Sequence, residues 1–187
     1  TDIFDEDYLA KIEKIKLLQQ LLAKAIDDFK KINKTRGLDF SEKFKALVDS
    51  YNQRKEDDVL VGNVLEDFTD EIIDLLQALK REKDSFADLG VDLEEKVFYD
   101  ILKDLTRKYD FEYPEDRLIA LSKAVKTVVD DKAKYTDWNQ RDDIKAELKV
   151  DLIILLAEHG YPPVDRDEVY KEIFEQAENF KKYQGEE

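Results

Sequence analysis

The fold class first becomes visible in the stretch YLAKIEKIKLLQQLLAKAIDDF, residues 8–29. Its apolar side chains recur at steps of three and four residues, at Tyr8, Ile12, Ile15, Leu18, Leu22, Ile26 and Phe29. This spacing is the period of an α-helix with one apolar face. The stretch therefore predicts a long amphipathic helix that buries one side against other parts of the chain.

The same helical period returns along the rest of the chain. Five further stretches show it, within residues 65–79, 97–105, 118–128, 144–155 and 170–180. No sustained alternation of apolar and polar residues indicates a strand, and only 5 Gly and 3 Pro interrupt the pattern. We therefore predict an all-α protein, an irregular bundle of about seven or eight helices.

Length and composition indicate a folded helical domain. A chain of 187 residues suits one domain, and 42% hydrophobic residues are enough for a packed core. Charged residues reach 41%, which suits helices with solvated faces. We predict a single helical domain over residues 1–187, with sub-bundles 1–83 and 92–187 joined by a hinge within residues 81–91 as an alternative.

Start and stop signals divide the pattern into separate helices. Capping pairs three residues apart predict helix starts at Asp92 with Glu95, Asp137 with Gln140, and Asp165 with Glu168. Pro114 is typical of a first helical turn. Glycines that favour a left-handed end conformation predict helix stops at Gly37, Gly90 and Gly160.

Four sequence elements in a fixed order carry a family resemblance. They are Ser50-Tyr51-Asn52-Gln53-Arg54, Phe98-Tyr99-Asp100, Thr136-Asp137-Trp138-Asn139-Gln140-Arg141, and Leu155-Leu156-Ala157-Glu158-His159-Gly160-Tyr161-Pro162-Pro163. Their order and spacing over most of the chain resembles the C-terminal helical region of the restriction (R) subunit of type I restriction-modification enzymes. The helix between Trp138 and Gly160 departs from the family because it is poorer in Lys and Arg, which puts a direct DNA contact in doubt.

The resemblance implies that the chain is a fragment of a larger multidomain subunit, consistent with a start at Thr1 rather than Met. In that family the whole enzyme is an endonuclease that cuts DNA after ATP-driven translocation, with ATP and Mg as cofactors. Its nuclease and motor domains lie N-terminal to this region. The implied partners are the methyltransferase and specificity subunits and the motor domain of the same subunit, in the cytoplasm, and the implied role is docking.

No catalytic, cofactor-binding or metal-binding residue is predicted within the chain itself. A Gly-rich phosphate loop is absent. Asp/Glu-x-Lys triplets of the nuclease type begin at Asp28, Glu94, Asp130 and Glu147, and we interpret all four as solvated helix faces. His159, the single histidine, precedes Gly160 and is predicted to be a cation at a helix C-terminus. Zero Cys excludes disulfides and Cys-ligated zinc.

The formal charge of −15 argues that the isolated chain has weak or absent DNA contact, because duplex binding depends on Lys and Arg at phosphates. Basic clusters near residues 30–36, 80–83 and 123–134 are flanked by acids, although one of them contacting phosphates in the whole enzyme is an alternative. No apolar run approaches the ~20 residues of a membrane-spanning helix. We predict no membrane association.

The candidate interface residues are Trp138, Tyr161, Pro162 and Pro163. Tryptophan is enriched among residues that dominate binding energy, but a Trp beside a helix start more often packs on the first turn. The Tyr-Pro-Pro segment suits either an extended docking segment or a rigid helix exit. The alternative to the restriction-enzyme hypothesis is a free-standing acidic helical interaction module. A small acidic helical enzyme is the third hypothesis.

Overall fold

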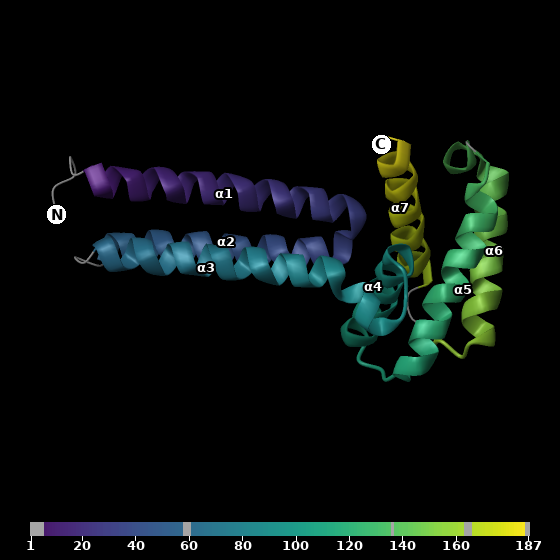
Figure 1. Ribbon diagram of the computed structural model, residues 1–187. Helices are drawn as coiled ribbons and strands as arrows, with labels where there is room; N and C mark the ends of the chain where they lie inside the picture. The colour runs from purple at the N-terminus through teal and green to yellow at the C-terminus, as the bar shows by residue number, and fades with distance from the viewer. Residues whose placement is uncertain (1–5, 58–60, 136, 163–165, 186–187) are drawn as a thin grey trace. The chain divides into compact units, whose positions relative to one another are not determined.

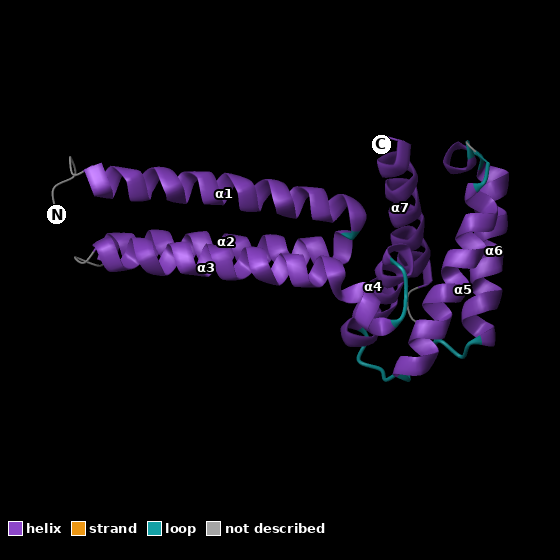
Figure 2. Cartoon of the chain, in the orientation of Figure 1, coloured by secondary structure: helices purple, strands orange, loops and turns teal. Residues whose placement is uncertain are grey.

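The computed structural model describes residues 6–57, 61–135, 137–162 and 166–185. Within these residues the chain forms seven α-helices, two short 3-10 helices and no strand (Figure 2), which confirms the all-α prediction. The α-helices are α1 Glu6–Ile32, α2 Lys34–Asp57, α3 Val61–Asp84, α4 Leu93–Lys108, α5 Glu115–Ala133, α6 Asp142–Glu158 and α7 Arg166–Gly185. The 3-10 helices are η1 Ser85–Leu89 and η2 Trp138–Gln140.

The contacts divide the chain into two compact units. Unit 1 consists of residues 1–30 and 36–84, and unit 2 consists of residues 31–35 and 85–187. In unit 1 the long helices α1, α2 and α3 lie side by side and run in alternating directions (Figure 1). In unit 2 helix α4 packs against both α5 and α7, and α5 packs against α6.

Unit 1 buries the apolar stripe that the sequence predicts for its first helix. Its core joins Ile15, Leu22, Ile26 and Phe29 of α1 to Phe40 and Tyr51 of α2 and to Val64, Leu65, Phe68, Ile72 and Leu79 of α3. The Tyr51 ring stacks on Phe68 with centroids 4.0 Å apart. Helix α2 contributes the fewest fully buried residues, and so it lies outside the six periodic stretches found in the sequence.

Gly37 does not end a helix, so the predicted stop is wrong. It lies in the first turn of α2, in unit 1. A Cβ at this position would lie 2.6 Å from Lys30 Cγ and 2.7 Å from Lys30 Cα, closer than packed atoms approach. Gly37 is therefore required by the close contact of α2 with the end of α1.

Unit 2 is organised around α4, whose buried residues form the middle of the second core. They include Val97, Phe98, Tyr99, Ile101, Leu102 and Leu105. The predicted capping pair is confirmed at its start: Asp92 Oδ1 accepts a hydrogen bond from the Glu95 amide at 2.8 Å, and the Asp92 amide donates to Glu95 Oε1 at 2.8 Å. Local sequence therefore fixes where the central helix begins.

The other boundary glycines of unit 2 behave as predicted. Gly90 and Gly160 have positive φ values of 70° and 66°, the conformation that glycine adopts without strain. The amide of Tyr161 then donates to Leu156 O at 2.9 Å, which closes the C-terminus of α6. Pro114 is the N-cap of α5, one residue before its first helical residue.

The predicted start at Asp137 is wrong. Residues Trp138–Gln140 form only the 3-10 helix η2, and α6 begins at Asp142 after Arg141. Asp137 has φ −107° and ψ 20°, outside the extended conformation of an N-cap, and its side chain makes no capping hydrogen bond. The third predicted start, at Asp165, lies outside the described residues. No helix among the described residues is both long and apolar enough to span a membrane.

Candidate interaction surfaces

A buried ion pair lies in the middle of α4. Lys96 Nζ lies 2.7 Å from both Oδ1 and Oδ2 of Asp100, and both side chains are less than a tenth exposed. Asn33 Nδ2 donates to Asp100 Oδ2 at 2.7 Å. The triplet that begins at Glu94 was predicted to be a solvated face, and for Lys96 this is wrong. A buried charge is stable only with a partner, which Asp100 supplies.

Gln176 of α7 satisfies the backbone on both sides of Asn33. Its Nε2 donates to Ile32 O at 2.6 Å, and its Oε1 accepts from the Lys34 amide at 3.1 Å. Lys34 Nζ also contacts Glu175 at 2.9 Å, a hydrogen bond that raises the pKa of Lys34. One backbone carbonyl at the end of α1 and one backbone amide at the start of α2 are therefore satisfied by the same side chain of α7.

The Phe98-Tyr99-Asp100 element gives each residue a different structural task. Phe98 is 1% exposed within the core, and Asp100 holds Lys96. The Tyr99 hydroxyl donates to Glu115 of α5, and this hydrogen bond is the main cause of the lowered pKa of Glu115. These contacts join α4 to α5 and to Asn33.

The Gly-Tyr-Pro-Pro element closes unit 2 around Tyr161. Its hydroxyl donates to Leu102 O at 2.8 Å, and burial raises the pKa of the phenol well above its ordinary value. The Phe111 and Tyr113 rings meet the Tyr161 ring edge-on, each with centroids 5.4 Å apart. His159 lies at the C-cap of α6, as predicted, with Nδ1 3.0 Å from Leu155 O.

Trp138 lies in the core of unit 2 with no exposed surface. Its indole Nε1 is buried without a hydrogen-bond partner among the described residues. Tyr161 is likewise 3% exposed, Pro162 is half-buried, and Pro163 lies outside the described residues. An interface role for these four residues stays a prediction, and a partner would reach Trp138 or Tyr161 only after its neighbours moved.

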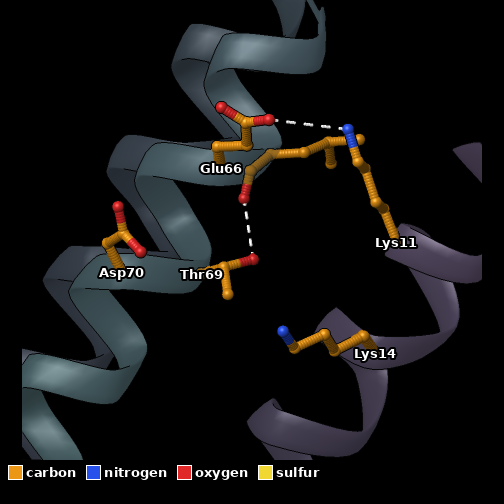
Figure 3. Close-up of a pocket in the computed structure, with 6 residues that line it drawn as sticks. Lys11, Lys14, Glu66, Thr69 and Asp70 are labelled. Carbon is orange, nitrogen blue, oxygen red and sulfur yellow. Dashed lines mark hydrogen bonds and ion pairs between the residues drawn. The ribbon is translucent and has the colours of Figure 1, made fainter.

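A surface hollow of about 280 Å³ lies between α1 and α3 of unit 1 (Figure 3). Lys11 Nζ lies 3.5 Å from Glu66 Oε1 across its rim, and Lys14 points toward the hollow from the same helix. Thr69 Oγ1 donates to Leu65 O at 2.8 Å, so this hydroxyl is already engaged. Because both side chains of this ion pair are exposed to solvent, the pair contributes little to stability.

Exposed apolar side chains gather on one helix of each unit. On α1 they are Leu9, Leu17 and Leu21, and on α6 they are Val150, Ile153 and Ile154. Single exposed leucines are common, but grouped ones mark contact surfaces. No group of three or more His, Asp or Glu side chains in the described part of the chain is placed to hold a metal ion. These two groups of exposed apolar side chains are the candidate interaction surfaces.

Family membership follows from a match over nearly the whole chain. Residues 1–183 match the family described as type I restriction enzyme HindI endonuclease subunit-like, C-terminal. The chain belongs to this family. The resemblance carried by the four sequence elements is confirmed.

The chain is similar to a protein of Methanocaldococcus jannaschii that is provisionally named type I restriction enzyme MjaIXP endonuclease subunit. The two are 20% identical over 191 residues, which covers 95% of this chain and 17% of that protein. The chain therefore spans a small part of the relative that it matches. No solved structure gives a significant match.

The sequence analysis missed two features of this family member. The first is the polar cluster of Asn33, Lys96, Asp100 and Gln176, whose members are brought together from three distant stretches. Its local signal was the pairing of Lys96 and Asp100 four residues apart within an apolar stripe. The second is the exposed apolar side of α6, signalled by Val150, Ile153 and Ile154 standing beside the buried stripe.

Proposed function

We propose that this chain is a non-catalytic C-terminal part of a type I restriction enzyme R subunit that docks onto the motor domain or onto the methyltransferase subunits. Family membership supports the type of enzyme. The exposed apolar side chains of α1 and α6 carry the docking role, because both cores are already filled by other residues. A surface of this kind is stabilised when a partner covers it.

The chemistry of the whole enzyme belongs to other parts of the subunit in this proposal. ATP and Mg²⁺ are used there for translocation and cleavage of DNA, while this region contributes assembly in the cytoplasm. The specificity subunit selects the DNA sequence. The formal charge of −15 favours protein docking over a grip on phosphates.

Co-purification tests the docking role directly. The purified 187-residue chain is immobilised and offered the methyltransferase subunits and the motor domain separately, and DNA binding is measured in parallel at low and near-physiological salt. We expect retention of one of the two proteins and little DNA binding. Submicromolar DNA affinity that falls steeply with salt, with neither protein retained, would replace docking by a DNA-binding role.

The absence of catalysis in this region has its own assay. The chain is incubated with plasmid DNA, Mg²⁺ and ATP, and both nicking and phosphate release are followed. We expect neither product above background. Turnover that disappears in a Glu147→Ala variant would contradict the proposal, because Glu147 begins a nuclease-type triplet.

A further inference from the structure

Helix α6 is apolar on two opposite sides. Its inner side is buried through Ile144, Leu148, Leu152 and Leu156. Its outer side exposes Ala146, Val150, Ile153, Ile154 and Ala157, which we call the outer α6 stripe. Val150 is 53% exposed and Ile154 is 50% exposed. With about 3.6 residues per turn, positions 146, 150, 153 and 157 follow one line along the helix.

The spacing of the outer α6 stripe is the one that helices use to pack against helices. Steps of four, three and four residues form the seam of paired helices, in which each side chain fits between residues of the facing helix. Ala146 and Ala157 are small, so a partner backbone approaches closely at both ends. Val150, Ile153 and Ile154 then supply the larger apolar contacts in the middle.

One edge of the outer α6 stripe is acidic. Asp143, Glu147 and Asp151 lie on three successive turns along it, and Glu158 follows two turns later. Asp143 pairs with Arg141 at 2.7 Å, and Lys132 of α5 lies 3.1 Å from Glu147 and 3.7 Å from Asp151, so two cations face these four carboxylates. The last turn of α6 contains no basic residue. The edge therefore keeps a net negative charge beside an uncovered apolar line.

We propose that the outer α6 stripe binds an amphipathic helix of a partner protein whose apolar side is bordered by Lys and Arg. The inference rests on the proposed docking function and states the chemistry of one partner surface. Ammonium and guanidinium groups on the incoming helix pair with the acidic edge, which sets its position along α6. Burial of the apolar line supplies the affinity.

Charge disfavours other occupants of the stripe. A second copy of this chain has the same formal charge of −15, which opposes the association of two copies. An anionic lipid surface meets the same repulsion. A basic helix is the occupant that matches both the apolar line and its border.

Two designed helical peptides test the proposal on the full 187-residue chain. Both carry the same Leu and Ile heptad seam, and one has Lys at the bordering positions while the other has Glu. Binding is titrated by fluorescence anisotropy at near-physiological salt. We expect the Lys peptide to bind more tightly than the Glu peptide by about tenfold or more.

Neutral substitutions then locate the binding surface. The double variant Val150→Gln with Ile154→Gln removes apolar contact without changing charge. We expect it to lower the affinity for the Lys peptide by about tenfold. The matched control is Leu17→Gln with Leu21→Gln on α1, where the side chains are similarly exposed. It should leave the affinity unchanged. Circular dichroism checks that both variants keep the helical content of the parent chain.

Three results would overturn the proposal. The first is equal affinity for the two peptides, and the second is loss of binding in the α1 variant but not in the α6 variant. The third is a dimer in sedimentation experiments that the α6 variant abolishes, which would assign the stripe to a second copy.

The same experiments distinguish a failure of the stripe proposal from a failure of the proposed docking function. If the α6 variant still retains the methyltransferase subunits or the motor domain as the parent chain does, the stripe proposal is wrong and docking stands. If the parent chain retains neither protein but discriminates the peptides as expected, docking to those partners is wrong and the chemistry of the stripe stands.

Discussion

The two units hold their helices together by different means. Unit 1 packs helices of 24 to 27 residues through apolar and aromatic contacts. Unit 2 packs helices of 16 to 20 residues and contains every polar side chain that is buried among the described residues: Asn33, Lys96, Asp100, Ser122 and Gln176. The core of unit 1 is thus built from apolar and aromatic side chains, with its ion pairs, such as Arg36 with Glu82, at partly exposed positions, whereas unit 2 also buries polar side chains from distant parts of the chain.

We expect the largest loss of stability from a substitution in the core of unit 2. Trp138→Ala removes the largest fully buried side chain, and we expect a loss of about 3–5 kcal/mol in the free energy of unfolding. Urea unfolding followed by circular dichroism measures it. Leu17→Ala, at a half-exposed position of unit 1, is the control and should change stability by about 0.5 kcal/mol or less. An unchanged transition with lost partner binding would make Trp138 an interface residue instead.

Asp100 tests whether unit 2 depends on its buried charges. Asp100→Ala removes the carboxylate that pairs with the buried Lys96 ammonium at 2.7 Å, and we expect a loss of about 3 kcal/mol in the free energy of unfolding. The double variant Lys96→Met with Asp100→Leu removes both charges and should recover most of that loss. Denaturant unfolding, followed by the fluorescence of the single tryptophan in the same unit, gives both values. A double variant as unstable as Asp100→Ala would show that packing at these positions matters more than charge.

Predictability from sequence follows the same division between local and distant causes. The helical class, the capping pair at Asp92 and the left-handed glycines Gly90 and Gly160 were predictable, because each depends on a few neighbouring residues. The hydrogen bond from Asn33 to Asp100 was not predictable, because the two residues lie 67 positions apart along the chain. The outer α6 stripe could not be predicted for another reason. Helix α6 has apolar residues on two sides, and the sequence alone does not show which of the two sides packs against the core.

Substitutions at one glycine of each unit should cause losses of stability of intermediate size. Gly37→Ala should cost about 1–2 kcal/mol, because the clash with Lys30 outweighs the gain in helix propensity. Gly90→Ala meets no atom within 4 Å but strains a positive φ, at a cost of roughly 1–2 kcal/mol.

Asparagine distinguishes the two causes, since it tolerates positive φ but is larger than alanine. In thermal unfolding, Gly90→Asn should be milder than Gly90→Ala, and Gly37→Asn should be worse than Gly37→Ala. The opposite order at residue 37 would restore that glycine to the helix-end role predicted from the sequence.

The smallest expected effect is a pH dependence that Glu115 gives to unit 2. The hydrogen bond from Tyr99 is the main cause of the lowered pKa of Glu115, and Lys103 at 2.9 Å adds to it. A carboxyl whose pKa is lower in the folded chain stabilises the fold above its ordinary pKa of about 4.5, and this contribution is lost as the pH falls through the lower folded value. The free energies of unfolding of the parent chain and of the Glu115→Gln variant should therefore differ most near neutral pH and converge as the pH falls. Urea titrations from neutral to acidic pH measure the convergence, and Tyr99→Phe as a background should reduce it. A difference in the free energy of unfolding that stays constant across that range would mean that Glu115 stabilises unit 2 by packing rather than by its charge.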